Sequence, residues 1–236
     1  MIEMKNSDYW FLCKPIFMKF MFAKFKNEII EFLKSDGIKD VDEGFNFFTV
    51  SYISKYNRLD LCEIVYAETD SFNGIDDSLA LAAEFGHLKV VKYLTRMGVS
   101  GSIYAMEWAA YKGRLDVIKW LDLNRSEGCT IYAMDYAAEM GHIHVVKWLH
   151  GNRSEGCSTN AMDFASRNGH LDVIEWLHSN RSEGCTTSAL YNAIEKGHLN
   201  IVKYLIESKL VELSRVVLIE AIKIADYWGH VEIAVI

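Results

Sequence analysis

The chain contains 236 residues, of which 50% are hydrophobic and 24% are charged, a mixture that can bury a large core and excludes a disordered chain. The formal net charge of −7 argues against nucleic-acid binding, because neutralising phosphates requires a basic surface. A single proline permits long helical content, so we expect a soluble and mostly helical protein.

Residues 1–45 are predicted to form a divergent N-terminal helical cap. Lys14, Lys19 and Lys24 interrupt their apolar run, which therefore supplies neither the ~20 apolar residues of a membrane span nor the continuous core of a signal peptide. We expect a cytoplasmic, intracellular chain that does not enter a membrane. The Met- and Phe-rich composition leaves an alternative, in which this segment docks a second protein and the chain acts as an adaptor.

A period of 28 residues dominates the rest of the chain. This step separates three series of identical residues, namely Trp120, Trp148 and Trp176; Cys129, Cys157 and Cys185; and Gly113, Gly141, Gly169 and Gly197. Residues 132–159 and 160–187 are identical at 17 of 28 positions. Such a period is typical of a solenoid, in which each unit buries its apolar face against its neighbours.

One unit, beginning at Tyr132, reads YAMDYAAEMGHIHVVKWLHGNRSEGCST. Its alanines and its Val-Val and Trp-Leu pairs mark one face of each of two helices, which Gly141 separates. The Gly-Asn-Arg-Ser-Glu-Gly segment that follows is a turn by composition. A hydroxyl residue precedes each first helix and is predicted to cap it, at Ser102, Thr130, Ser158 and Thr186.

The Ala-Ala, Gly-His and Val-Val-Lys positions recur in one register, with variants, as ALAAEFGHLKVVKYL at 80–94, AMDYAAEMGHIHVVKWL at 133–149 and AMDFASRNGHLDVIEWL at 161–177. This pattern resembles the ankyrin repeat, clearly over residues 76–207 and more weakly outside. The resemblance implies stacked helix pairs that bind another protein and catalyse no reaction. It is closest to a short variety of the repeat that carries WLHxNRSEGCT.

The units depart from the usual ankyrin repeat of about 33 residues that starts with T-P-L-H. The histidine of that motif is replaced by Glu107, Asp135, Asp163 and Tyr191. The five missing residues fall after the second helix, where the family has a β-hairpin finger. We therefore predict an all-α helix-turn-helix solenoid of about six or seven stacked repeats with reduced or absent fingers.

The array has predicted boundaries on both sides. A degenerate repeat is expected at 46–75, the ankyrin-like array at 76–215, and a truncated C-terminal repeat or cap at 216–236. Terminal units of a solenoid are atypical because one of their faces meets water.

The Gly-His positions form a column at His87, His142, His170, His198 and His230. Adjacent units lie roughly 10 Å apart, so equivalent histidines cannot share a metal ion, and we expect them to pack and hydrogen bond between units. The cysteines are expected to be unpaired packing residues for the same reason. Each Arg-Ser-Glu turn, as at Arg153 and Glu155, is expected to hold a local ion pair. We expect no metal, cofactor, catalytic residue or small-molecule substrate.

Positions that differ between units can encode a particular partner, whereas invariant positions suit stacking. The most variable ones flank the Ala-Ala pair on the first helix, where ankyrin proteins commonly contact their partners. The predicted partner-binding residues are Trp108, Tyr111, Lys112, Tyr136, Glu139, Met140, Phe164, Arg167, Asn168, Glu195 and Lys196. Trp108, Tyr136 and Phe164 have an equally good alternative role as partly buried rings that stack on one another.

The leading hypothesis is a non-enzymatic protein–protein interaction module that uses a concave face made by the first helices and short loops. The alternatives are the adaptor described above and an enzyme. The enzyme would need a single non-repeating polar constellation in the flanks, 1–70 or 208–236, where no motif is found.

Overall fold

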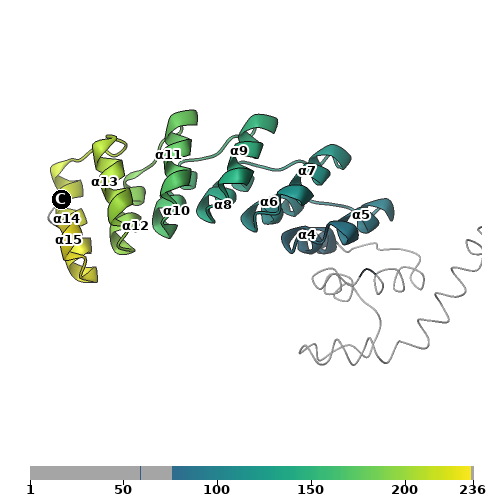
Figure 1. Ribbon diagram of the computed structural model, residues 1–236, viewed down its shortest axis with the longest axis horizontal. Helices are drawn as coiled ribbons and strands as arrows, with labels where there is room; N and C mark the ends of the chain where they lie inside the picture. The colour runs from purple at the N-terminus through teal and green to yellow at the C-terminus, as the bar shows by residue number, and fades with distance from the viewer. Residues whose placement is uncertain (1–58, 60–75, 235–236) are drawn as a thin grey trace, which may run out of the picture. The chain divides into compact units, whose positions relative to one another are not determined.

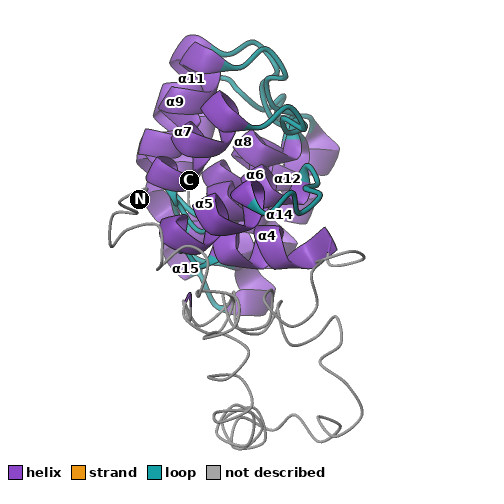
Figure 2. Cartoon of the chain, turned by 90° about the vertical axis from the view of Figure 1, so that its right-hand side faces the viewer, coloured by secondary structure: helices purple, strands orange, loops and turns teal. Residues whose placement is uncertain are grey.

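A computed structural model of the chain describes Leu59 and residues 76–234 (Figure 1). This part of the chain contains helices and loops and no strand (Figure 2). The predicted all-α fold with reduced or absent hairpin fingers is therefore confirmed. The predicted N-terminal cap at 1–45 and the degenerate repeat at 46–75, apart from Leu59, lie outside the described residues.

The contacts between residues divide the chain into two compact units, Met1–Ala105 and Met106–Ile236. The described part of the first unit contains α4 (Asp76–Glu84) and α5 (Leu88–Arg96). The division falls inside α6 (Tyr104–Tyr111), which forms a pair with α7 (Leu115–Asn124) in the repeat pattern.

The second unit continues with helix pairs that follow one another (Figure 1). Their bounds are α8 (Tyr132–Glu139) and α9 (Ile143–Asn152), α10 (Asn160–Asn168) and α11 (Leu171–Asn180), α12 (Thr187–Glu195) and α13 (Leu199–Glu207), and α14 (Arg215–Trp228) and α15 (Val231–Ala234). The first helices of successive pairs, α8, α10, α12 and α14, contact one another in chain order. Each first helix also contacts the second helix of its own pair.

The core of each pair combines small and large apolar side chains. On α8 the buried residues include Ala133, Met134, Ala137 and Ala138, and on α9 they are Val145, Val146 and Leu149. Alanine allows the backbones of neighbouring first helices to approach closely, and the larger side chains of the second helix fill the space behind them. The same pattern recurs in α10 and α11, so each pair completes the core of the next.

The Gly-His junction locks successive pairs together. Gly141 ends the first helix of its unit with φ 73°, and a Cβ placed there would lie 2.6 Å from Nδ1 of His170 in the next unit. His142 packs in the same way on Gly113, and its Nε2 donates a hydrogen bond to the carbonyl oxygen of Tyr111 at 3.1 Å. Burial lowers the pKa of His142. The predicted packing and hydrogen-bonding role of the histidine column is confirmed for these units.

A buried carboxylate forms a second junction between successive pairs. The Asp135 carboxylate accepts hydrogen bonds from the backbone N–H of Ser158 at 2.8 Å and from the Ser158 hydroxyl at 2.6 Å. That hydroxyl in turn accepts a hydrogen bond from the N–H of Asn160 at 3.1 Å, which caps α10. The same arrangement joins Glu107 to Thr130 and Asp163 to Thr186. The acidic replacements of the usual histidine are thus structural.

The capping prediction is confirmed at Thr130, Ser158 and Thr186, and it is wrong at Ser102. The Ser102 hydroxyl is buried and has no hydrogen-bond partner within the described residues. The residue 23 positions earlier, which is a carboxylate in the other three cases, is here the buried Leu79. No acceptor orients the Ser102 hydroxyl toward its helix, so the cap is not made.

The Arg-Ser-Glu turns form ion pairs as predicted, and two of them also contact the preceding unit. Arg153 donates to both oxygens of Glu155, and this hydrogen bond lowers the pKa of the Glu155 carboxyl. Its Nη1 also donates to the Asp122 carboxylate at 2.9 Å. Arg125 pairs with Glu127 and Arg181 pairs with Glu183 in the same local way. Nη1 of Arg181 also lies 3.4 Å from Nδ1 of His150 in the preceding unit. The turn therefore fixes the connection between one helix pair and the next.

Candidate binding surface

The predicted partner-binding residues lie on the first helices α6, α8, α10 and α12 or directly after them. The side chains of Arg167, Asn168 and Lys196 are exposed, and those of the other eight predicted residues are half-buried. The residues that follow each Ala-Ala pair, such as Glu139 and Met140, lie at the C-terminal end of the helix, next to the Gly-His junction. All of these positions recur in the same place of successive units.

Three tyrosines from two neighbouring units form an aromatic cluster on this surface. The Tyr136 ring stacks against Tyr132 with a centroid distance of 5.8 Å and meets Tyr111 edge-on at 6.0 Å. Lys112 extends its ammonium group over the Tyr111 ring, 5.0 Å from the centroid. Burial raises the pKa of the Tyr136 phenol above its ordinary value. We call Tyr111, Tyr132 and Tyr136 the tyrosine cluster.

The cluster includes a residue that the sequence pattern did not single out. Tyr132 is 49% exposed and Ile131 beside it is 37% exposed, at the N-terminal end of α8. Tyr132 lies one helical turn before Tyr136, so both rings occupy the same helix face. A signal was available, because the equivalents of Tyr132 in the two following units are Asn160 and Ser188, and this position therefore varies as strongly as the selected ones.

The backbone under the predicted residues is held by the following unit. His198 lies 3.1 Å from the carbonyl oxygen of Arg167, and His230 lies 3.2 Å from that of Glu195. The Asn168 side chain donates to the carbonyl oxygen of Glu139 at 2.8 Å. These bonds satisfy carbonyl groups at helix ends, where no intrahelical partner remains. The side chains of this surface therefore project from a fixed backbone.

Charges of both signs accompany the aromatic rings. Glu195 and Lys196 form an ion pair at 2.9 Å, and the Lys196 ammonium group lies 5.9 Å from the centroid of the Trp228 ring. Arg167 at the end of α10 and Glu139 at the end of α8 add one charge of each sign. Charged groups of both signs therefore lie beside the aromatic rings on this surface.

A metal site or a nucleophile would need reactive or metal-binding side chains in a suitable arrangement. In the described part of the chain no group of three or more His, Cys, Asp or Glu side chains is arranged to hold a metal ion. Cys129, Cys157 and Cys185 carry free thiols, and burial raises the pKa of the Cys157 thiol to about 11, which disfavours the reactive thiolate. The prediction of unpaired cysteines is confirmed for these three residues.

Models of the family described as ankyrin repeats match residues 106–150, 134–215 and 162–234. The chain belongs to the ankyrin repeat proteins. Ankyrin repeats are generally protein–protein interaction modules, and the family is typically non-enzymatic. A comparison of this ankyrin repeat protein with the curated proteins finds no match.

The described helices of this ankyrin repeat protein are short. Within the described ranges, none combines the length and the apolar character that crossing a membrane would take. Among α4 to α15 the longest is α14, which has 14 residues.

Proposed function

We propose that this ankyrin repeat protein binds a partner protein through the side chains of its first helices, with the tyrosine cluster as the centre of the contact. Tyr111, Tyr132 and Tyr136 carry the proposal, because they combine ring-to-ring contacts with solvent access on neighbouring units. Tyrosine is enriched in the energetic centres of interfaces, since its ring buries a large apolar area and its hydroxyl retains a hydrogen bond.

The fixed backbone supports this proposal energetically. A partner that binds a rigid surface loses its own freedom but does not have to order the surface first. The hydrogen bonds that hold the carbonyl groups of Tyr111, Arg167 and Glu195 restrict the first-helix ends before any partner arrives. Binding energy is then available for the contact itself.

The flanking residues would provide specificity around the tyrosine cluster. Arg167 and Asn168 on one side and Lys112 on the other present donors, and Glu139 presents a carboxylate. Mixed charges at the rim of an interface select partners and guide encounter more than they add affinity. We therefore expect the tyrosines to set affinity and the charged residues to set selectivity and salt dependence.

The test is capture of partners from the native cell extract by the immobilised full chain. Tyr132→Ala combined with Tyr136→Ala is expected to weaken retention of a specifically captured protein by about 100-fold in affinity, the sum of two hot-spot losses. The matched control is Leu123→Ala on α7, because Leu123 is 82% exposed and lies on a second helix. Equal retention by the wild type and the tyrosine variant, with unchanged melting temperatures, would contradict the proposal.

A further inference from the structure

Helix α14, the first helix of its pair, is much less buried than the other first helices in the described part of the chain. Its only buried side chain is Ala225, whereas α8 buries five residues in a shorter helix. Large apolar side chains lie open on α14, with Val216 75%, Ile219 46% and Ile222 48% exposed. An apolar helix face of this extent is unusual on a protein surface and marks an interaction site.

The exposed face of α14 corresponds to the face of α8 that packs against the next unit. Counting from the Gly-His pair, Ile222, Lys223 and Asp226 occupy the positions of Met134, Asp135 and Ala138. The α8 residues are buried, and Asp135 accepts the hydrogen bonds of Ser158 in the following unit. Their counterparts on α14 are exposed.

The two polar replacements decide which kind of partner fits this side. A unit stacked as α10 stacks on α8 would bury Asp226 where the array has a small alanine. It would also meet Lys223, which cannot accept a hydrogen bond, where the array has a carboxylate acceptor. Lys223 pairs with Glu220 of its own helix at 3.3 Å, but burying Asp226 without a partner of opposite sign is strongly unfavourable. The partner must instead bring its own complementary charges.

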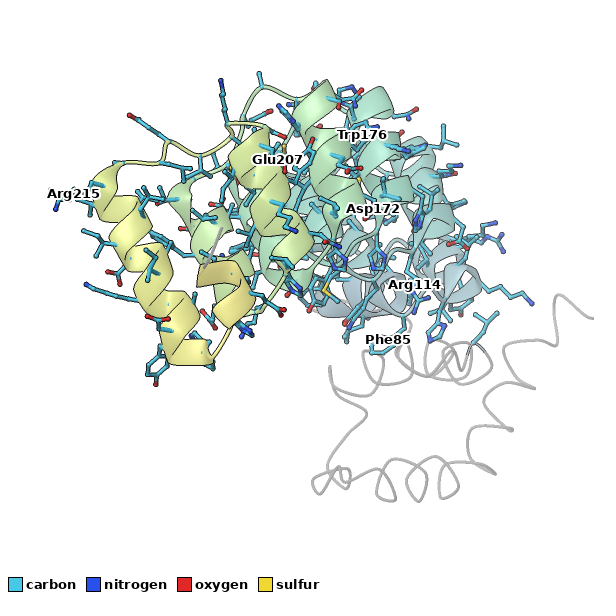
Figure 3. The ribbon with its side chains drawn as sticks, turned by 60° about the vertical axis from the view of Figure 1, so that its left-hand side comes forward. Phe85, Arg114, Asp172, Trp176, Glu207 and Arg215 are labelled. Carbon is cyan, nitrogen blue, oxygen red and sulfur yellow. The ribbon has the colours of Figure 1, made fainter. Side chains whose placement is uncertain are left out.

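A second copy of α14 brings those charges if the two helices run antiparallel. Arg215, Ile219, Ile222 and Asp226 are separated by 4, 3 and 4 residues and therefore form one stripe along the helix. In an antiparallel pair centred on this stripe, Ile219 meets Ile222 of the other copy, and Arg215 meets Asp226. Both charged side chains are exposed, and Figure 3 shows Arg215 directed away from the neighbouring helices.

We propose that this protein self-associates as a twofold dimer through α14, with a central Ile219–Ile222 contact and an Arg215–Asp226 ion pair at each end. The macrodipoles of the two antiparallel helices oppose each other, which is favourable. One pair of short helices buries less surface than the 1,200–2,000 Å² of a stable interface, so we expect a weak dimer with a dissociation constant on the order of 10–100 µM. This inference does not rest on the proposed partner-binding surface.

The first experiment measures the dissociation constant of the full chain by sedimentation equilibrium over a wide concentration range. The wild type is expected to approach a dimer, whereas Ile219→Asp combined with Ile222→Asp stays monomeric. Leu123→Asp on α7 is the matched control, since it places the same charge on another exposed apolar position and should dimerise like the wild type. A wild type that stays monomeric up to several hundred micromolar overturns the proposal, and so does a Leu123→Asp effect equal to that of the double variant.

The second experiment tests the antiparallel arrangement itself. Arg215→Asp and Asp226→Arg each bring like charges together at both ends of the dimer and should raise the dissociation constant about tenfold or more. Each substitution agrees with the helix dipole, so α14 should persist, which circular dichroism can verify.

Mixing these two variants in equal amounts restores an ion pair at both ends of a heterodimer. At one end the two substituted side chains, an aspartate and an arginine, face each other, and at the other end the native Arg215 meets the native Asp226. The mixture should therefore associate within about threefold of the wild-type dissociation constant. Association of the mixture no stronger than that of either variant alone overturns the antiparallel pairing. Dimerisation of Arg215→Asp at wild-type strength overturns it as well.

Discussion

Ser158 and Ser102 occupy the same place in their units, but their hydroxyl groups have opposite surroundings. The Ser158 hydroxyl donates to Asp135 and caps α10, whereas the Ser102 hydroxyl is buried and has no hydrogen-bond partner in the described part of the chain. The difference lies 23 residues earlier, where Leu79 stands in place of the carboxylate. A capping residue is thus effective only when the preceding unit supplies an acceptor that orients it.

The largest expected effect comes from removing the carboxylate of the intact junction. Asp135→Ala leaves the Ser158 N–H and hydroxyl without their acceptor, in a region where water has little access. We expect a loss of about 3 kcal/mol in the free energy of unfolding, measured by urea denaturation of the full chain. Asp135→Asn is the control, because its amide keeps one acceptor oxygen, and it should lose less than half as much. A loss below about 0.5 kcal/mol for the alanine variant would mean that the junction does not stabilise the array.

The second-largest expected loss of stability comes from a substitution in the Gly-His junction. This junction is made in the same way in successive units. Gly141→Ala places a Cβ in the left-handed region at φ 73° and 2.6 Å from His170. We expect a loss of about 2 kcal/mol, the combined cost of backbone strain and displacement of the ring. Gly151→Ala is the matched control, since Gly151 lies within α9 and a Cβ there would meet no atom within 4 Å. That variant should be neutral or slightly stabilising, and a similar loss in both would argue against the specific contact.

The two serines allow the comparison to be tested directly. Ser158→Ala removes a cap and an inter-unit hydrogen bond and should cost about 1–2 kcal/mol of unfolding free energy. Ser102→Ala removes a buried hydroxyl that has no partner among the described residues, so its effect should lie between neutral and a gain of about 1 kcal/mol. Thermal unfolding of both variants under identical conditions gives the difference. Equal losses would show that the Ser102 hydroxyl is as well satisfied as that of Ser158.

The smallest expected effect is a pH dependence carried by Asp135. Burial raises the pKa of its carboxyl, and the hydrogen bonds from Ser158 oppose this shift without cancelling it. Because the folded-state pKa is then higher than the unfolded one, the contribution of Asp135 is fully present below about pH 4 and decreases as the pH rises through the folded-state pKa. The stability of the wild type relative to Asp135→Asn should therefore fall as the pH rises from about 4 through the folded-state pKa of this carboxyl. A relative stability that rises as the pH increases above about 4 would contradict the assigned burial effect.

Much of the architecture could be predicted from the periodicity alone. The 28-residue step, the alanine face of the first helix and the Gly-His boundary correctly indicate stacked helix pairs with reduced or absent hairpin fingers, and the described residues contain no strand. The histidine column could also be interpreted, because a translation of roughly 10 Å between units excludes a shared metal ion. Such inferences succeed because equivalent residues of successive units occupy equivalent positions, so that what holds for one unit holds for the others.

The candidate binding surface was only partly predictable. Variation between units directed attention to the first helices, and all eleven predicted residues lie at least partly open to solvent, while their role in binding stays a prediction. Tyr132 was missed because the choice of positions centred on the Ala-Ala pair, although the contact of Tyr132 with Tyr136 makes it part of the same cluster. Ring contacts between units depend on how the helices approach each other, which a sequence pattern does not specify.

By itself, the sequence determined the repeat, its helix pairs and its membership of the ankyrin repeat family, because regular spacing of small, turn-forming and apolar residues leaves few ways to bury a continuous core. The tertiary structure decided which polar residues join one unit to the next. It revealed that Asp135 accepts a hydrogen bond from Ser158 and that Ser102 has no acceptor in the described chain. It also showed that the apolar side of α14 is exposed to solvent. These contacts join residues that are about 23 or more positions apart in the sequence. Whether such residues come into contact depends on how whole helices pack against one another.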